Sequence, residues 1–236
     1  MKAIILAAGK GERLRGALDN IPKPMIRYRG KPILQHNIDL CRNSGIREIF
    51  INTHHLHEVI RSYFGDGSAF GVNIRYSLEE EMLGTAGALN NFRDYLAGEE
   101  FFVLYGDNFS NFDLSSLTEE FHKHDCIGVI AFHHRDDVSQ SGVGEFAPDG
   151  RIVRFIEKPK SGSTDSHWVN AGIYYLSPVV FEYIPLGNSD FGKDIFPRLL
   201  KEGIPIYSVC SDVSLKAFDT PVLLRDAFRG ADDSRR

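Results

Sequence analysis

The sequence predicts an α/β fold, in which helices lie on both faces of a mostly parallel, mixed sheet. Two patterns predict this fold: apolar runs alternate with helical patterns through the first half of the chain, and a hairpin pattern follows in the second half. A length of 236 residues is enough to bury a sizeable core. We therefore expect a Rossmann-like three-layer α/β/α architecture without a β-helix domain.

The first half of the chain is expected to form repeated strand–helix units. Apolar runs predict strands at about 2–7, 47–52, 72–77, 101–106 and 126–132. The segments between them predict helices near 32–43, 56–64, 85–97 and 114–124. Pro32 suits the first turn of the first helix, and Gly45 ends that helix. Because parallel strands are joined by right-handed crossovers, their carboxyl ends meet at one edge of the sheet, where ligands bind.

The pattern changes after about residue 135. The stretch "GEFAPDGRIVRFIEKP" predicts a hairpin that turns at Asp149-Gly150. The elements expected after it are a strand at "WVNAGIYYLS", helices near 178–184 and 194–202, a strand near 205–210 and a helix near 221–229. No linker interrupts the chain, so a single domain over 1–230 is expected, with halves 1–135 and 136–230 and a disordered tail at 231–236.

Charge and cysteine content narrow the class of protein. The net charge of −5 argues against a general nucleic-acid binder. Residues 1–31 nevertheless carry eight Lys or Arg against two acidic residues, which indicates a local site for an anionic ligand. The three cysteines are far apart, and neither a signal-peptide pattern nor a membrane-spanning run is present, so a cytoplasmic location without membrane partners is expected.

The stretch "ILAAGKGERL" leaves an apolar strand through two glycines into a cluster of charges. Gly9 and Gly11 allow positive φ and let backbone N–H groups approach an anion, so a phosphate-binding loop is one interpretation. A structural turn without chemical role is the other. Arg13 follows near an expected helix start, and Lys23 lies between two prolines in "IPKPM", which restrict its backbone. These two cations favour the phosphate interpretation.

Asp107 ends the apolar strand "FFVLYGD" directly after Gly106. A carboxylate at the carboxyl end of a strand is well placed to hold Mg²⁺ at the ligand-binding edge. The alternative is an Asp that caps the following segment.

At this point the motifs resemble a known family, the sugar-1-phosphate nucleotidyltransferases, also called nucleotide-sugar pyrophosphorylases. The resemblance begins with "LAAGKGERL" and "IPKPM" and covers nearly the whole chain. The later motifs, in the order of the family, are "LGTAGAL" (83–89), "GDN" (106–108), "EKP" (157–159), "VNAGIY" (169–174) and "DIFPRLL" (194–200). The closest likeness is to short mannose- or heptose-1-phosphate guanylyltransferases.

The resemblance implies attack by a sugar 1-phosphate on the α-phosphorus of an NTP, which yields an NDP-sugar and pyrophosphate. Positioning and charge neutralisation dominate such a transfer. Residues 1–135 would form the nucleotide-binding half and 136–230 the sugar-phosphate-binding half. By resemblance the catalytic residues are Arg13 and Lys23. Those for nucleotide are Leu6, Ala7, Ala8, Gly9, Gly11, Glu79, Gly84 and Thr85. Those for sugar phosphate are Gly144, Glu157, Lys158, Asn170 and Gly172.

The resemblance makes Asp107 the first Mg²⁺ ligand and places a second near the end of the chain. The family writes Asp-x-Gly-Thr-Pro there, whereas this sequence has "AFDTPVLL". A strict alignment puts Ala217 at the acidic position, and a two-residue deletion keeps Asp219 there. We prefer Asp219, because a Phe-Asp step after a strand is the family pattern. The departure also leaves a non-catalytic regulatory subunit that binds nucleotide sugar as an alternative.

The nucleotide base is expected to be read by the run Glu79, Glu80 and Glu81. A carboxylate can accept from N1–H and N2–H of guanine together, a pair that uracil and adenine do not offer. Solvated acidic side chains are the alternative for each. GTP is therefore favoured, and a mannose- or heptose-like 1-phosphate follows from the resemblance. "NTHHLHE" and "RYSLEEE" also resemble uridylyltransferases that act on N-acetylmuramate 1-phosphate, so a uridylyl- or cytidylyltransferase on another acceptor phosphate stays open, as does a homo-oligomer.

Nine histidines raise the question of a zinc site. They include the clusters His54/His55/His57, His122/His124 and His133/His134. No Cys or carboxylate completes a ligand set at a standard zinc spacing, so no zinc site is expected from the sequence.

Overall fold

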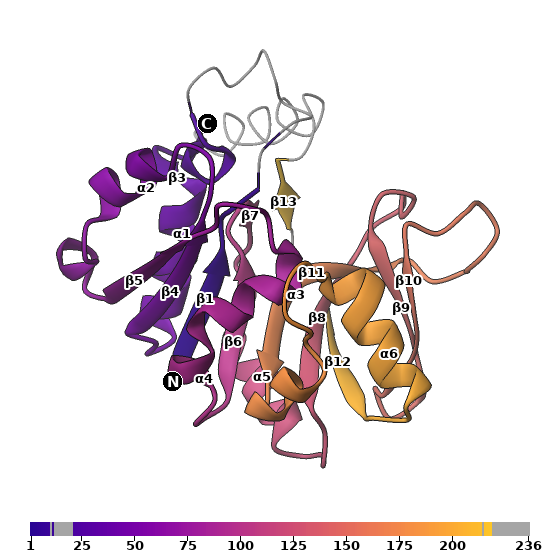
Figure 1. The fold of residues 1–236 in the computed structure, drawn as a ribbon. Coiled ribbons are helices and arrows are strands. Elements are labelled where there is room, and N and C mark those ends of the chain that lie inside the picture. The colour runs from indigo at the N-terminus through magenta and orange to yellow at the C-terminus, as the bar shows by residue number, and fades with distance from the viewer. Residues whose placement is uncertain (10, 12–20, 214, 219–236) are drawn as a thin grey trace. The chain divides into compact units, whose positions relative to one another are not determined.

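The computed structural model describes residues 1–9, 11, 21–213 and 215–218, and these residues fall into two compact units (Figure 1). Unit 1 comprises Met1–Met82, Leu104–Asn111 and residues 215–218. Unit 2 comprises Leu83–Val103 and Phe112–Val213. The chain therefore leaves unit 1 twice and returns to it twice.

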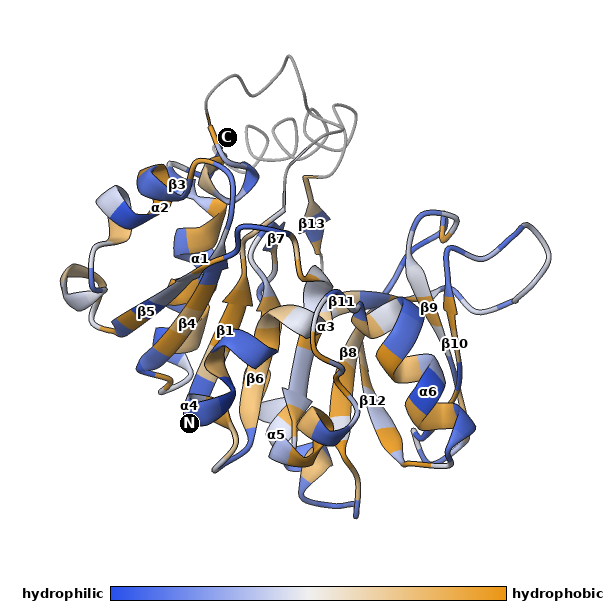
Figure 2. Ribbon diagram, viewed as in Figure 1, coloured by the Kyte–Doolittle hydropathy of each residue, from blue (hydrophilic) through white to orange (hydrophobic). Residues whose placement is uncertain are grey.

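The sheet of unit 1 is built from parallel strands. Its strands are β1 (Lys2–Leu6), β4 (Glu48–Thr53), β5 (Asn73–Leu78) and the last residues of β6 (Phe101–Tyr105). The order is β6–β1–β4–β5, and both β1·β4 and β4·β5 are parallel, with Ile4 opposite Phe50. Strands β1, β4 and β6 are apolar and buried along most of their length (Figure 2), as expected for strands covered on both faces, whereas β5 buries only Ile74.

Helix α1 (Ile33–Asn43) buries a stripe along one side and ends in a defined cap. Ser44 is its C-cap and Gly45 adopts a φ of +81°. The Gly45 N–H donates to the Arg42 carbonyl and the Ile46 N–H to the Cys41 carbonyl, which is a Schellman motif. Gly45 thus ends the helix as expected, whereas Pro32 precedes its first residue and belongs to β3 (Lys31–Pro32).

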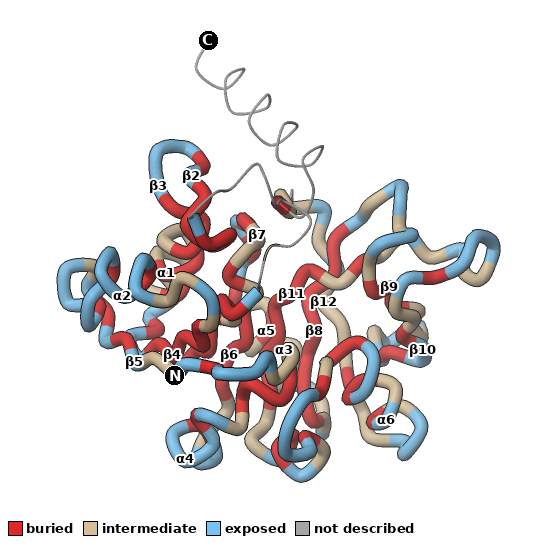
Figure 3. The backbone as a smooth tube through the Cα atoms, turned by 45° about the horizontal axis from the view of Figure 1, so that its top comes forward, coloured by how far each residue is buried: buried red, intermediate tan, exposed pale blue. Residues whose placement is uncertain are grey.

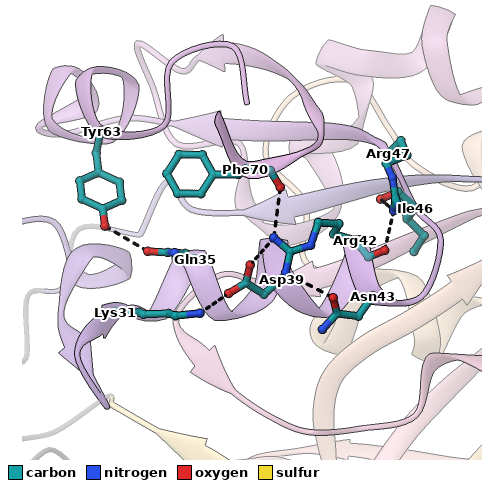
Figure 4. A network of polar contacts seen from close by, with 9 residues as sticks. All are labelled: Lys31, Gln35, Asp39, Arg42, Asn43, Ile46, Arg47, Tyr63 and Phe70. Atoms are coloured by element: carbon teal, nitrogen blue, oxygen red, sulfur yellow. Dashed lines mark hydrogen bonds and ion pairs between the residues drawn. The ribbon is translucent and has the colours of Figure 1, made fainter. Parts of the chain in front are cut away.

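Polar contacts tie α1 to the following elements of unit 1 (Figure 4). Asp39 accepts from Lys31 at 2.8 Å and from Arg42 at 3.0 Å, and Arg42 reaches the Phe70 carbonyl at 3.2 Å. Tyr63 of α2 (His57–Phe64) donates to Gln35 at 3.0 Å. Because the cationic partners Lys31 and Arg42 are partly exposed, these ion pairs contribute little net stability, although Asp39 is only 14% exposed.

Unit 1 is completed by short elements that the sequence did not predict. They are the 3₁₀ turns η2 (Lys23–Met25) and η3 (Ser68–Phe70) and the strands β2 (Arg27–Tyr28), β7 (Asn108–Phe109) and β13 (Lys216–Ala217). β13 pairs with β7, and Phe218 lies in a core cluster with Ile26, Tyr28, Ile33 and Phe109. The chain near its last described residue thus packs against segments from the first third and the middle.

Unit 2 contains a largely antiparallel group of strands. They are β8 (Gly128–His134), β9 (Gly142–Phe146), β10 (Ile152–Glu157), β11 (Trp168–Leu176) and β12 (Ile206–Ser211). β9 and β10 form the predicted hairpin, β11 pairs with β8 and β9, and β12 runs parallel to β8. β8 and most of β11 are buried (Figure 3). The predicted α/β fold with a mixed sheet is confirmed.

The helices of unit 2 are shorter than predicted. They are α3 (Gly84–Gly87), η4 (Ala88–Phe92), α4 (Arg93–Leu96), α5 (Leu114–Phe121), η5 (Pro178–Glu182), η6 (Phe191–Ile195) and α6 (Phe196–Lys201). The helix expected near 85–97 is present as a run of helical turns over 84–96, but its middle part, η4, is a 3₁₀ segment between α3 and α4. The Ala86 and Gly87 N–H groups at its start donate to the Ser189 carbonyl. The helix near 178–184 is a 3₁₀ turn, and the helix near 194–202 begins as a π-turn.

The helix expected near 221–229 and the tail at 231–236 lie outside the described residues. Among the residues described, no helix has the length and apolar character needed to cross a bilayer.

Candidate active site

The loop after β1 is the first part of the site. Leu6 ends the strand, Ala7 and Ala8 are buried, and Gly9 is exposed, with open space around its Cα. Gly11 has a φ of +61°, and a Cβ there would lie 3.6 Å from the Cβ of Lys23. Gly11 therefore lies beside Lys23 in a backbone conformation that favours glycine.

Lys23 and Asp107 form the charged centre of unit 1. Lys23 begins the turn η2 after Pro22, and its side chain is only 7% exposed. Its Nζ donates to Oδ2 of Asp107 over 2.5 Å, across 84 positions of sequence. A nearly buried ammonium requires such a partner, because an unpaired buried charge is costly. Asp107 is 29% exposed, so it stays accessible to a ligand.

Packing around Asp107 explains the motif "GDN". The Gly106 N–H donates to the Leu6 carbonyl at 2.9 Å, and a Cβ on Gly106 would lie 2.9 Å from that oxygen. Only glycine lets the end of β6 come this close to β1. On the other side, Asn37 of α1 donates to the Asn108 carbonyl at 3.0 Å. Asp107 is thus held between two anchored neighbours.

A buried polar chain joins the ends of β1, β4 and β5. The Ala7 N–H donates to Oδ1 of Asn52 at 2.8 Å, and Nδ2 of Asn52 donates to Oε1 of Glu79 at 2.8 Å. Asn52 is 2% exposed and Glu79 3% exposed. Nδ1 of His54 lies 2.7 Å from the Glu79 carbonyl oxygen. Glu79 is therefore not the solvated acid that the alternative described, whereas Glu80 and Glu81 are exposed.

The described donors fit a magnesium ion at Asp107. Oδ2 of Asp107 accepts from Lys23, and the other carboxylate oxygen makes no hydrogen bond with any described residue. Mg²⁺ is commonly held by one or two carboxylates together with substrate phosphates. Ala217, the alternative second position, pairs with Asn108 and has no ligand atom in its side chain. Arg13 and Asp219 lie outside the described residues.

In unit 2, Gly84 and Thr85 are held by the segment before η6. Gly84 has a φ of +75°, and a Cβ there would lie 2.3 Å from the Ser189 carbonyl oxygen. Thr85 donates its hydroxyl to Asp190 at 3.0 Å and accepts from the Phe191 N–H at 2.9 Å. The motif "LGTAGAL" thus packs against, and hydrogen-bonds to, the segment before η6 within unit 2.

Glu157, at the end of β10, lies against two glycines. A Cβ on Gly142 would lie 2.9 Å from its Oε2, and one on Gly192 would lie 2.7 Å from it. Its side chain makes no hydrogen bond or ion pair with any described residue. Desolvation, followed by the nearby Asp190, raises the pKa of Glu157, and Lys158 and Lys193 oppose the shift. The half-buried carboxylate thus has no hydrogen-bond donor among the described residues and keeps access to water.

Lys158 is exposed and adopts a left-handed φ of +50°. Its N–H donates to the Ser141 carbonyl at 3.0 Å. A non-glycine residue in this region costs on the order of 1–2 kcal/mol, and the surroundings must hold it there. The buried Pro159 that follows helps to fix this turn.

The other predicted sugar-side residues have local structural roles. Oδ1 of Asn170 accepts from the Gly172 N–H, and Nδ2 donates to the Tyr174 hydroxyl, both at 2.8 Å. These bonds span a register shift in the pairing of β11 with β8, where Gly172 has a φ of +68°. At Gly144 a Cβ would lie 2.6 Å from the Phe132 ring.

Comparison with known protein families identifies the family of this chain. A family model described as nucleotidyl transferase matches residues 2–214. The chain belongs to the nucleotidyl transferase family. The match spans Lys23, Asp107 and Lys158 and covers most of both units.

Curated relatives of this nucleotidyl transferase differ in the nucleotide and sugar that they are named for. A UTP–glucose-1-phosphate uridylyltransferase from Synechocystis is 38% identical over 226 residues, which cover 90% of this chain and 58% of the relative. A mannose-1-phosphate guanylyltransferase from Mycobacterium tuberculosis is 33% identical over 98% of this chain and 64% of the relative. The chain thus spans little more than half the length of such relatives.

Solved structures share the fold of this nucleotidyl transferase. A putative glucose-1-phosphate thymidylyltransferase from Bacillus anthracis, in complex with a sucrose, superimposes with a TM-score of 0.88 at 27% identity, over 99% of this chain and 96% of that one. HddC from Yersinia pseudotuberculosis gives a TM-score of 0.81 at 24% identity, over 97% of this chain and 98% of that one.

Sequence reasoning missed Asn52 in this nucleotidyl transferase. A signal was present, because Asn52 is a polar residue inside the apolar run "IFIN", and a buried amide must find hydrogen-bonding partners. Its partners lie 45 and 27 positions away, so their identity was not readable.

Proposed function

We propose that the chain transfers a nucleotidyl group from an NTP, with GTP favoured, to a sugar 1-phosphate and releases pyrophosphate. The observation that carries this proposal is the nearly buried Lys23–Asp107 pair beside Gly11 in a chain of the nucleotidyl transferase family. An ammonium and a carboxylate that neutralise each other keep the site stable before substrate arrives. They also supply one group for phosphate and one for a metal ion.

In unit 1, the amides of Gly9 and Gly11 would receive the triphosphate, and Arg13 would contact the leaving pyrophosphate. Lys23 would bind phosphate oxygens and stabilise the negative charge that grows during transfer. Mg²⁺ on Asp107, and in our proposal on Asp219, would neutralise charge on the same phosphates. Support for Asp219 comes from β13, which returns the chain to β7 just before this residue. The Asn52–Glu79 chain would keep the loop at Ala7 in place.

In unit 2, Lys158 would bind the phosphate of the sugar 1-phosphate. Its exposure and its fixed backbone leave the ammonium accessible at a defined position. Glu157 and Asn170 would accept from sugar hydroxyls. A carboxylate without a donor among the described residues gains most from such a ligand. The oxygen of the sugar phosphate would then attack the α-phosphorus.

The choice of GTP rests on the carboxylate of Glu79 or its neighbours as acceptor for guanine, and on the several relatives named as mannose-1-phosphate guanylyltransferases. UTP is a second candidate, favoured by the 38% identical relative named UTP–glucose-1-phosphate uridylyltransferase. A cytoplasmic reaction suits the three free cysteines.

The test measures pyrophosphate release with each of the four NTPs and a panel of sugar 1-phosphates, with and without Mg²⁺. We expect the highest kcat/KM for GTP with mannose 1-phosphate, and loss of release without Mg²⁺. A higher value for UTP with glucose 1-phosphate would replace the GTP assignment. Failure of every pair to release pyrophosphate, while a nucleotide sugar still binds, would identify a regulatory subunit instead.

A further inference from the structure

Three side chains able to bind metal meet at one end of the β8–β11 pair in unit 2. They are His134, Asp136 and His167, and one ligand atom from each lies within 4.8 Å of the other two. All three are exposed. None belongs to the proposed transferase chemistry, and the third comes from a segment more than 30 residues beyond the first two.

The antiparallel pairing of β8 with β11 creates this arrangement. His134 ends β8 opposite Trp168, the first residue of β11, and the Arg135 N–H extends the ladder to the His167 carbonyl at 3.0 Å. Strand β8 ends at His134 and the backbone bends at Asp136, and the three side chains come together at this bend. The neighbouring His133 is buried, and this desolvation, followed by the charge of Arg135, lowers the pKa of its ring to about 4.

The three side chains are oriented and available. Nδ1 of His167 lies 3.2 Å from the Arg135 carbonyl oxygen, so it carries the proton and leaves Nε2 as acceptor. Metal-binding histidines usually make such a bond to a carbonyl through their second nitrogen. The side chains of His134 and Asp136 make no hydrogen bond or ion pair with the residues that the structure describes. The His134 ring is confined by the His167 ring at 5.5 Å and by the edge of Trp168 at 5.7 Å.

We propose that His134, Asp136 and His167 bind a divalent transition-metal ion, with Zn²⁺ as the preferred occupant and water completing its coordination. Two imidazoles and one carboxylate suit Zn²⁺ and not Mg²⁺, which prefers oxygen ligands. Zinc bonds of about 2.0–2.1 Å separate tetrahedral ligands by roughly 3.3 Å, so the side chains must close by about 1.5 Å. Exposed side chains can do so by rotation. The ion would fasten the segment after β8 to the start of β11.

The test measures Zn²⁺ binding to the untagged chain by titration calorimetry with Mg²⁺ in large excess, so that carboxylate sites that prefer Mg²⁺ are occupied. We expect one Zn²⁺ per chain and an increase in Tm with Zn²⁺. His134→Ala and His167→Ala should each weaken binding at least about tenfold, since even the loss of a partner behind a ligand costs 10- to 100-fold. Asp136→Asn should weaken it less, because the amide oxygen remains. The matched control His55→Ala removes another exposed histidine and should leave binding unchanged.

Co²⁺ gives a second readout that does not depend on enzymatic activity. Its visible absorption should show nitrogen ligation in the wild-type chain and lose intensity in His167→Ala. Equal Zn²⁺ affinity in wild type and His167→Ala would overturn the proposal, as would the absence of saturable binding below millimolar Zn²⁺. Binding that survives His167→Ala but is lost in Cys210→Ser would move the metal to the exposed thiol. Failure of pyrophosphate release would leave these measurements unaffected.

Discussion

In unit 1, Lys23 and Asp107 neutralise each other at 2.5 Å, and Glu79 is buried on the amide of Asn52. In unit 2, by contrast, Glu157 lies against two glycines without a donor among the described residues, and Lys158 is exposed on strained backbone. The first arrangement is stable without a ligand. The second leaves these groups to water until something binds. On the proposed function, the NTP would exchange partners with the ion pair in unit 1, and the sugar 1-phosphate would replace water in unit 2.

The largest effect is expected from breaking the Lys23–Asp107 ion pair of unit 1. Asp107→Asn and Lys23→Ala should each lower kcat about 10³-fold or more, since both remove a group that stabilises phosphate charge in the transition state. The Asp107→Asn chain should keep its fold, because the amide oxygen still accepts from Lys23. Steady-state pyrophosphate release and circular dichroism measure the two properties. Lys31→Ala, which removes an exposed ion pair of the same unit, serves as control, and wild-type turnover in Asp107→Asn would refute the metal assignment.

The next largest effect concerns Lys158 in unit 2, where two substitutions separate the role of its charge from that of its backbone strain. Lys158→Ala and Lys158→Gly should both lower kcat/KM for the sugar 1-phosphate about 10- to 100-fold, because both lose a charged hydrogen bond. Lys158→Gly should be about 1 kcal/mol more stable than Lys158→Ala, since glycine accepts the φ of +50°. Chemical denaturation compares the two. Equal stability would show that this turn is not strained.

A smaller effect concerns the buried amide of unit 1. Asn52→Ala should destabilise the fold by about 2 kcal/mol, because the Ala7 N–H and one oxygen of Glu79 lose their partner. The KM for NTP should rise as the loop loosens. The exposed Asn43 gives a matched control, since Asn43→Ala should change neither quantity. An unchanged unfolding free energy in Asn52→Ala would mean that water replaces the amide fully.

The smallest effect is expected from substituting Glu157, the half-buried acid of unit 2. A raised pKa means that folded Glu157 holds its proton more tightly than the unfolded chain does, so its ionised form lowers stability at neutral pH. Glu157→Gln should therefore raise Tm slightly at pH 7, and the gain should disappear as the pH falls to about 4.5. Sugar 1-phosphate turnover should fall in the same variant. Thermal melts across pH measure the gain, with the exposed Glu182→Gln as comparison. A Tm gain that is the same at pH 4 and 7 would contradict this account.

How well each part of the fold can be predicted depends on how far apart in the sequence its interacting residues lie. The strands near β1, β4, β5 and β6 and the cap at Gly45 were readable, because apolar period and cap chemistry are local. The packing of the helix near 85–97 against Gly187 and Ser189 was not, because these residues lie about 100 positions away in the sequence. For the same reason β7 and β13, two residues each, appear only when the chain returns to itself.

Parts of the candidate site were also readable. Proline restraint around Lys23 and the strand end at Asp107 predicted two separate charged groups, and the structure brings them into one ion pair. The burial of Glu79 was not readable, because its partner Asn52 lies on another strand 27 positions away. The hydrogen bonds of Asn170 to Gly172 and Tyr174 are local but depend on the irregular backbone of β11 at Gly172. His134, Asp136 and His167 illustrate the limit most clearly, since a search by zinc spacing passes over ligands that pairing of two strands brings together.

The return of β13 to β7 has a consequence for synthesis on the ribosome. Phe218 is fully buried in a cluster with Tyr28 and Phe109, so this cluster stays open to solvent after Tyr28 has been made until translation reaches position 218. At about 5–20 residues per second, that delay is on the order of 10–40 seconds. For that interval the apolar side chains that Phe218 covers lack this partner.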